Sequence, residues 1–153
     1  MSVTQIKLQN DLLEKILNAS LEEVITVLEE YLNCKIFFDL IEQNTTKPGT
    51  TFERKITISA EGLPLIRAVI KFDKKILPPF IVKDLLQKQK KIGTILQKYD
   101  LSNEKYIVFQ RQDEKKIFRI YEIKNNDKVW FQISEEIRLD HLSSIQREFP
   151  LEN

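Results

Sequence analysis

Cysteine and histidine are nearly absent from this chain, which has one residue of each, Cys34 and His141. A disulfide needs two cysteines, and a structural zinc site takes four ligands drawn mainly from these two residue types. Glycine is also scarce, and Gly49, Gly62 and Gly93 are too far apart for either spacing of a phosphate-binding loop. We therefore expect a protein without disulfides, without a metal and without a cofactor.

Neither sign of charge predominates, because 24 Lys and Arg residues are balanced by 23 Asp and Glu residues. A net charge of +1 provides no overall field for nucleic acid or for an anionic membrane. No apolar run approaches the roughly 20 residues of a membrane span, and the N-terminus lacks the order of a signal peptide. We expect a soluble protein with no nucleic-acid partner and no membrane span.

The length and apolar content are those of a single globular domain. A chain of 153 residues, 42% of them hydrophobic, can bury roughly two thirds of its unfolded surface in one core. We expect one domain over residues 1–153, and a monomer. The abundance of Lys, Ile and Asn beside only three Gly is typical of an AT-rich genome. This composition favours the plastid stroma if the gene is plastid-encoded, and the cytoplasm otherwise.

Hydrophobic periodicity predicts helices and then strands, twice in succession. Helical spacing marks residues 12–17, 21–33, 79–86 and 92–99, and Ser20 with Glu23 forms a capping box before the second helix. Strand patterns mark residues 35–42, 52–59, 63–72, 105–112, 115–124 and 128–139, and a partly helical tail follows. Turn residues stand at Glu61-Gly62 and at Asn125-Asn126-Asp127. Strands joined by short turns pair antiparallel, so the predicted fold class is α+β.

One charged residue interrupts the apolar side of the last strand. Glu135 falls on the side that also carries Val129, Phe131, Ile133, Ile137 and Leu139. A desolvated carboxylate needs a cation, a hydrogen-bond donor or a ligand hydroxyl nearby. The alternative is a β-bulge at Glu135-Glu136 that turns this side chain to solvent.

A second charged residue interrupts the strand at residues 52–59. Arg54 falls on the same side as Phe52, Ile56 and Ile58. A guanidinium stays charged when desolvated, and its fork of donors matches a carboxylate in two parallel hydrogen bonds. Arg54 and Glu135 therefore predict an interior site for a small carboxylate. The alternatives are that the two side chains pair with each other, or that Arg54 extends from a strand end to solvent.

Three further signals are weaker. The first turn of the helix after Ser20 favours an anion, but Glu23 already supplies negative charge there, which favours simple capping. Arg67 lies opposite the cleaner apolar set of its strand, so its face is ambiguous. A basic run lacks interleaved aromatic residues and is more typical of a solvated helix face than of a nucleic-acid site; it comprises Lys83, Lys88, Lys90 and Lys91.

Five short segments, in order, resemble the chorismate pyruvate-lyase family. Residues 54–64 show its arginine, strand and turn, and end in Gly62-Leu63-Pro64. The other four segments are Asn18-Ala19-Ser20-Leu21, Ile41-Glu42-Gln43-Asn44, Ile92-Gly93-Thr94-Ile95-Leu96 after Leu77-Pro78, and Ile133-Ser134-Glu135. Together they span about residues 12 to 139 and are most similar to a small, divergent branch that includes algal plastid-encoded proteins.

The resemblance implies a single antiparallel sheet of about six strands with helices packed around it. It also implies that chorismate is enclosed and released as 4-hydroxybenzoate and pyruvate without a cofactor. In this interpretation Arg54 binds the ring carboxylate with the backbone N–H of Leu21, and Glu135 is the acid or hydrogen-bond partner at the ether and hydroxyl end. Val69 stands where the family has a second arginine, and Arg67 could replace that arginine with a shift of one pleat.

The sequence thus leaves three functions open. The first is a chorismate lyase that uses Arg54 and Glu135. The second is a non-catalytic module of the same fold that binds a small carboxylate such as 4-hydroxybenzoate or chorismate. The third is a structural or assembly protein in which the two buried charges only neutralise each other.

Overall fold

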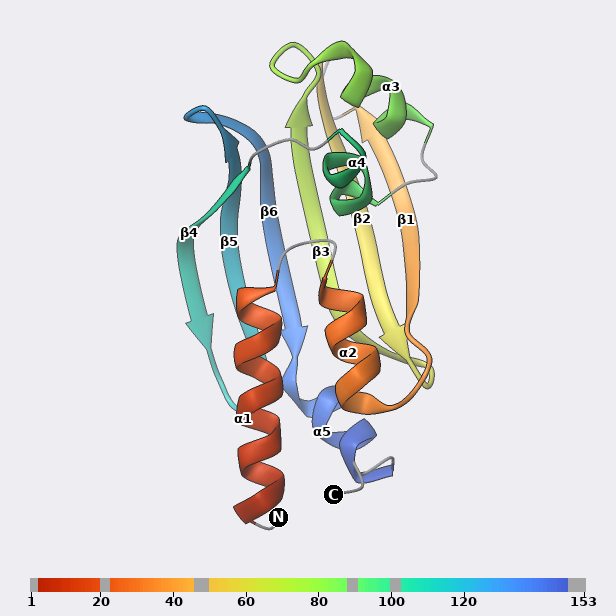
Figure 1. Ribbon diagram of the computed structural model, residues 1–153, viewed down its shortest axis with the longest axis vertical. Helices are drawn as coiled ribbons and strands as arrows, with labels where there is room; N and C mark the ends of the chain where they lie inside the picture. Colours follow the sequence, from red (N-terminus) through yellow and green to blue (C-terminus); the bar gives the residue numbers. More distant parts are fainter. Residues whose placement is uncertain (1–2, 20–22, 46–49, 88–90, 100–102, 149–153) are drawn as a thin grey trace.

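One antiparallel sheet forms the centre of the fold (Figure 1). The computed structural model describes residues 3–19, 23–45, 50–87, 91–99 and 103–148. Its helices are α1 (Val3–Asn18), α2 (Val24–Leu32), α3 (Pro79–Leu86), α4 (Ile92–Lys98) and α5 (Leu139–Glu148). Its strands are β1 (Phe37–Thr45), β2 (Thr51–Ala60), β3 (Leu63–Asp73), β4 (Glu104–Gln112), β5 (Lys116–Asn125) and β6 (Lys128–Arg138). The predicted α+β class is confirmed.

The strand order is β1-β2-β3-β6-β5-β4, and every neighbouring pair is antiparallel. Two of the connections are two-residue turns at positions that the sequence predicted. Glu61 and Gly62 have φ of 52° and 76°, and Asn126 and Asp127 have φ of 49° and 65°. Positive φ at both central residues defines a type I′ turn, whose twist matches that of the flanking strands. The turn residues therefore determine where the β2–β3 and β5–β6 hairpins form.

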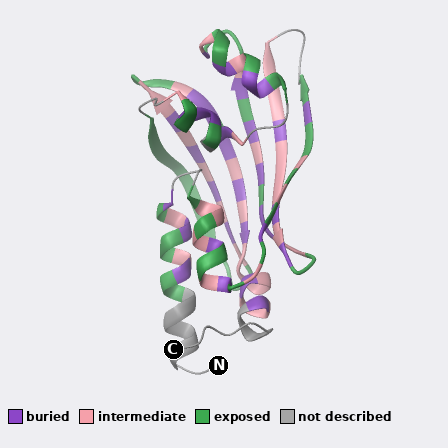
Figure 2. Cartoon of the chain, turned by 45° about the vertical axis from the view of Figure 1, so that its right-hand side comes forward, coloured by how far each residue is buried: buried purple, intermediate pink, exposed green. Residues whose placement is uncertain are grey.

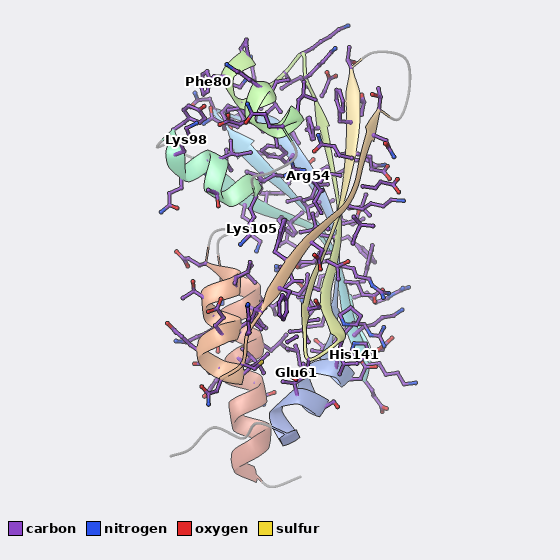
Figure 3. All side chains as sticks on the ribbon, turned by 90° about the vertical axis from the view of Figure 1, so that its right-hand side faces the viewer. Arg54, Glu61, Phe80, Lys98, Lys105 and His141 are labelled. Atoms are coloured by element: carbon purple, nitrogen blue, oxygen red, sulfur yellow. The ribbon has the colours of Figure 1, made fainter. Side chains whose placement is uncertain are left out.

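Helices α1, α2, α3 and α4 cover one face of the sheet (Figure 3). The α1–α2 pair covers the lower half in the orientation of Figure 1, the α3–α4 pair covers the upper half, and α5 lies at the lower end. Figure 2 shows buried residues alternating with others along the strands, as one covered face requires. Across the described residues, no helix is both long and apolar enough to cross a membrane.

The interior divides into two hydrophobic clusters, one under each helix pair. The upper cluster joins α3 and α4 to the sheet and contains Ala68, Ile70, Phe72, Leu77, Ile81, Leu85, Ile92, Ile95, Leu96, Tyr121, Ile123, Trp130, Phe131 and Ile133. The lower cluster joins α1, α2 and α5 to the sheet and contains Leu12, Ile16, Leu28, Leu32, Ile36, Ile58, Ala60, Leu65, Ile66, Ile117, Ile137, Leu142 and Ile145. The region where the two clusters meet holds the cavity described below.

Helix α2 begins later than the sequence predicted. Its N-cap is Glu23, which makes no side-chain capping hydrogen bond, and its first helical residue is Val24. The proposed capping residue Ser20 lies outside the described residues. The helix ends as predicted near Asn33, which takes the left-handed conformation at φ 50°.

Candidate functional site

A cavity lies between the two helix pairs, against the covered face of the sheet. Among the described residues, twelve that line it are apolar, and eight of these are isoleucine; they come from α1 and the residue after it, from α2 and α4, and from strands β1, β2, β3 and β6. Six further residues bring polar groups to it: Arg54, Lys91, Lys105, Arg119, Tyr121 and Glu135. The space open to the centres of water-sized spheres is about 50 Å³. Because one water needs about 10–15 Å³ on this measure, there is room for several waters or for a compact ligand.

Arg54 on β2 is buried, with 1% of its surface exposed. Its Nε donates to Oε1 of Gln43 at 2.7 Å, and its Nη2 donates to the carbonyl oxygen of Leu85 at 3.2 Å. Gln43 completes the arrangement by donating from Nε2 to the same Leu85 oxygen at 2.9 Å. Burial lowers the pKa of Arg54 to about 10, so the guanidinium remains charged at neutral pH. These two acceptors, on Gln43 and Leu85, are uncharged.

A β-bulge in β1 brings Gln43 to Arg54. The pairing of β1 with β2 shifts between Leu40 and Glu42, which leaves Ile41 as the extra residue. Beyond the bulge, Gln43 is directly opposite Arg54. Glu42 is exposed instead, with one carboxylate oxygen 3.6 Å from Nζ of Lys55. Without the bulge, strict alternation would direct Glu42 to the covered face, so the extra residue places a neutral amide there in place of a carboxylate.

Glu135 on β6 is buried and paired with a cation from the neighbouring strand. Nε of Arg119 donates to Oε1 of Glu135 at 2.5 Å, and the hydroxyl of Tyr121 is 3.4 Å from Oε2. Arg119 is 2% exposed and Glu135 is 7% exposed. The pairing of β6 with both neighbours is regular through Ser134, Glu135 and Glu136, so the alternative of a bulge at this point is wrong.

Arg119 also joins the sheet to the end of α1. Its Nη1 donates to the carbonyl oxygen of Leu17 at 3.0 Å, and its guanidinium lies 4.9 Å from the ring centre of Tyr121. Burial, and secondly the nearby carboxylate of Glu135, raises the pKa of Tyr121 well above its usual value. Tyr121 therefore remains a neutral hydrogen-bond donor.

Lys105 on β4 directs its ammonium into the same region. As a residue it is exposed, but its Nζ lies 3.2 Å and 3.4 Å from the carbonyl oxygens of Leu17 and Ala19 and 4.6 Å from the Tyr121 ring centre. Burial of this ammonium, and secondly repulsion by Arg119, lowers the pKa of Lys105 to about 8. Figure 3 shows Lys105 at the level of the gap between the two helix pairs.

The polar lining is strongly unbalanced in charge. Of the six polar lining residues that the structure describes, four are cationic side chains and one, Glu135, is a carboxylate. Lys91, the residue before α4, is the fourth cation, and its Nζ lies 5.2 Å from the ring centre of Phe38. An otherwise apolar cavity with excess positive charge favours an anion with an apolar body. Among the described residues, no group of three or more His, Cys, Asp or Glu is placed to hold a metal ion.

Arg54 and Glu135 both line the cavity, as their strand positions predicted. The alternative that they pair with each other is wrong, because Arg119 and Tyr121 are the partners of Glu135. Arg54 does not extend to solvent either. Leu21, the predicted source of a backbone N–H, lies outside the described residues.

Arg67 lies elsewhere. It is exposed on β3, and it does not line the cavity, whereas its neighbours Ile66 and Ala68 do. Val69 stands where the family pattern has a second arginine. It lies on the same face of β3 as Arg67 and does not line the cavity either. The structure therefore gives Arg67 no position from which to replace that arginine; the buried arginine that accompanies Arg54 in the cavity comes from β5.

Three of the cavity's cations were not predicted as site residues: Lys91, Lys105 and Arg119. Arg119 shares one side of β5 with Ile117, Tyr121 and Ile123, so the alternation that identified Arg54 also identifies Arg119. Lys91 belongs to the basic run interpreted as a solvated face; Lys83 is exposed as expected, but Lys91 is half-buried and lines the cavity. Lys88 and Lys90 lie outside the described residues.

No family profile and no curated protein matches this sequence. Solved structures are similar in fold. The effector domain of PhnF from Mycobacterium smegmatis matches 72% of this chain and 85% of its own, with 8% identity and a TM-score of 0.50. A second structure of PhnF from the same organism matches 80% of this chain and 65% of its own, with 8% identity and a TM-score of 0.54. Likeness at such low identity concerns the fold alone. This chain has the chorismate-lyase-like α+β fold that effector domains of GntR-family regulators share.

Proposed function

We propose that this chain is a binding module for a small carboxylic acid with an apolar body. The observation that carries the proposal is the lining of the cavity, in which, among the described residues, four cationic side chains and one carboxylate interrupt twelve apolar residues. A carboxylate that enters gains attraction from the excess cations, while its body replaces water against isoleucine side chains. The likeness to an effector domain supports a binding role.

Within this proposal, Arg54 and Lys105 are the residues that recognise the acid group. Arg54 hydrogen-bonds to Gln43 and Leu85, Lys105 hydrogen-bonds to Leu17 and Ala19, and both cations line the cavity. Arg119 is already neutralised by Glu135, so it contributes less to a ligand. The limited volume favours a small monocarboxylic acid such as 4-hydroxybenzoate over chorismate, which carries an additional enolpyruvyl group.

Lyase activity is the second candidate, and the observation that favours it is that Arg54 and Glu135 line the same cavity. The hydrogen bonds of Glu135 favour binding over catalysis. One of its carboxylate oxygens accepts from Arg119 and the other from Tyr121, so both act as acceptors. A general acid would instead have to donate a proton to the departing group. We therefore expect no pyruvate above background when the purified protein is incubated with chorismate, and clear pyruvate release would favour the lyase.

The binding proposal is tested by thermal unfolding with 4-hydroxybenzoate and with its neutral amide. At a ligand concentration of 100 Kd the acid should raise Tm by about 5–10 °C. The amide should have little effect, because it lacks the charge that the cavity attracts. Arg54→Lys should weaken the response to the acid, and Arg67→Lys, on the other face of the sheet, is the matched control. An equal response to acid and amide, or no response to any small aromatic acid, would contradict the proposal.

A further inference from the structure

Strand β4 is an exposed edge of the sheet with an apolar centre. All nine of its residues are exposed, and its four central residues are Tyr106 at 59%, Ile107 at 43%, Val108 at 55% and Phe109 at 47% exposure. β4 is the last strand in the sheet order, so the backbone groups on its outer side have no strand partner among the described residues. Charged or proline residues usually protect such an edge, and the four central residues of β4 include neither.

A β-bulge determines which side chains of β4 share a face. The pairing with β5 shifts between Ile107 and Phe109, so Val108 is the extra residue. Tyr106 lies beneath Lys124 on the outer face of the sheet, and Phe109 packs on Phe118 with ring centres 6.3 Å apart. Tyr106 and Phe109 therefore share the outer face although they are three residues apart.

The inner face of β4 is defined in the same way. The ammonium of Lys105 reaches the Tyr121 ring, and Ile107 and Gln110 line a groove beside α1. The bulge thus places Lys105 and Gln110 on one face, and it places Tyr106 and Phe109 on the other.

These faces select one register for pairing with an identical strand. Residues directly opposite in an antiparallel pair share a face, so Tyr106 can pair with Phe109 of a second copy. That pairing sets Lys105 opposite Gln110, Ile107 opposite Val108 and Glu104 opposite Arg111. The opposite charges of Glu104 and Arg111 then face each other twice, once on each side of the two-fold axis. The neighbouring register, with Val108 opposite itself, would instead set Lys105 against Arg111 and Tyr106 against Gln110.

We propose that β4 is a dimer interface at which two copies of this chain pair antiparallel, so that their sheets form one continuous sheet across a two-fold axis. The occupant is a second copy because the strand complements itself in charge, in face and in its apolar centre. Main-chain hydrogen bonds join the strands, and Tyr106 packs on Phe109 of the partner. Lys105 belongs both to this strand and to the cavity lining, but the pairing of the two strands requires no bound ligand. The proposed dimer differs from the monomer that the sequence analysis expected.

The test is the molar mass of the whole chain in solution, measured by light scattering after size-exclusion chromatography over a series of concentrations. The native chain should dimerise as concentration rises. Arg111→Glu or Glu104→Arg alone should raise the dissociation constant by about tenfold or more, since each reversal turns two attractive pairs into repulsive ones. The double swap of both residues should restore the native constant. Lys71→Glu, an exposed charge reversal on β3, is the matched control and should leave the constant unchanged.

A second variant tests the apolar centre. Val108→Lys should abolish the dimer while circular dichroism and Tm stay near native, because Val108 is exposed in the monomer. Ile41→Lys on the opposite edge strand should leave the dimer intact. A chain that is monomeric at every concentration would overturn the proposal. So would a double swap that fails to restore the constant, or loss of the dimer through Ile41→Lys.

Discussion

Removing the charge of Glu135 should be among the most damaging single changes to stability. Glu135→Gln keeps the shape of the side chain but leaves the guanidinium of Arg119 without its counter-charge at a site where the two residues are 2% and 7% exposed. Removing one partner of a buried ion pair costs about 3–5 kcal/mol. A domain of this size has a total stability of about 5–15 kcal/mol, so the variant should lose a large fraction of it.

A double-mutant cycle separates the pair from its surroundings. Arg119→Met alone should cost a similar amount, because the carboxylate is then left buried beside only the hydroxyl of Tyr121. Arg119→Met with Glu135→Leu removes both charges and should recover most of the loss, because apolar replacements of a buried pair are often neutral. Both variants that lack Arg119 also lose its hydrogen bond to Leu17. The double variant should therefore remain less stable than the native protein by the contribution of that hydrogen bond.

Urea unfolding provides the assay, because Trp130 is the chain's one tryptophan and is buried. With a typical slope of about 2 kcal/mol/M, a loss of 4 kcal/mol lowers the midpoint by about 2 M at an unchanged slope. A midpoint lowered by less than about 0.5 M would mean that water already solvates the pair, and the burial argument would fail. Glu135→Gln also removes the one carboxylate among the described lining residues, so the affinity of the protein for 4-hydroxybenzoate should rise. A purely structural role would leave that affinity unchanged.

Three further changes test separate parts of the structure. Gln43→Leu should lower the free energy of unfolding by about 1–3 kcal/mol, because Arg54 loses a buried hydrogen-bond acceptor. Asn44→Ala, at an exposed position, is the control and should change the free energy of unfolding by no more than about 0.5 kcal/mol. Urea unfolding measures both changes. Lys105 has its pKa lowered to about 8, so between pH 8 and 10.5 the unfolded chain holds more protons and this group makes stability rise with pH. The urea midpoint of Lys105→Met should therefore rise less than that of the native protein between pH 8 and 10.5. Gly62→Ala should cost about 1–2 kcal/mol in thermal unfolding, because φ is +76° and a Cβ would meet nothing within 4 Å, so the cost is one of backbone conformation alone.

The parts of the fold that the sequence predicted correctly are those set by local rules. Turn residues with positive φ placed the β2–β3 and β5–β6 hairpins. Alternation placed Arg54 and Glu135 on the covered face, because both lie in stretches of strand where the pairing is regular. The same rule identifies Arg119 when it is applied to β5.

The parts that the sequence could not supply depend on interruptions and on distant contacts. The bulge at Ile41 reverses the alternation, so no count along β1 could direct Gln43 to Arg54. The ammonium of Lys105 is held at the cavity by hydrogen bonds to carbonyl oxygens that lie 86 and 88 residues away in sequence. Lys91 lies just before α4, outside any helix or strand, so no periodic pattern assigns its side chain to a face. These positions become evident only when the two helix pairs are docked on the sheet.

The charge balance of the cavity connects stability with binding. The apolar residues of the cavity lining cannot solvate a cation, so burial of the Lys105 ammonium and the Arg54 guanidinium lowers the stability of the protein. Both pKa values shift in the direction that this cost requires, downward through desolvation. An anion that enters restores the lost electrostatic free energy at both residues together. The pKa of Lys105 must then rise when the ligand binds, so binding below pH 8 should change the charge of Lys105 little, whereas binding near pH 9 should take up a proton. Calorimetry in buffers of different ionisation enthalpy measures that uptake, and its absence near pH 9 would exclude Lys105 from the binding site.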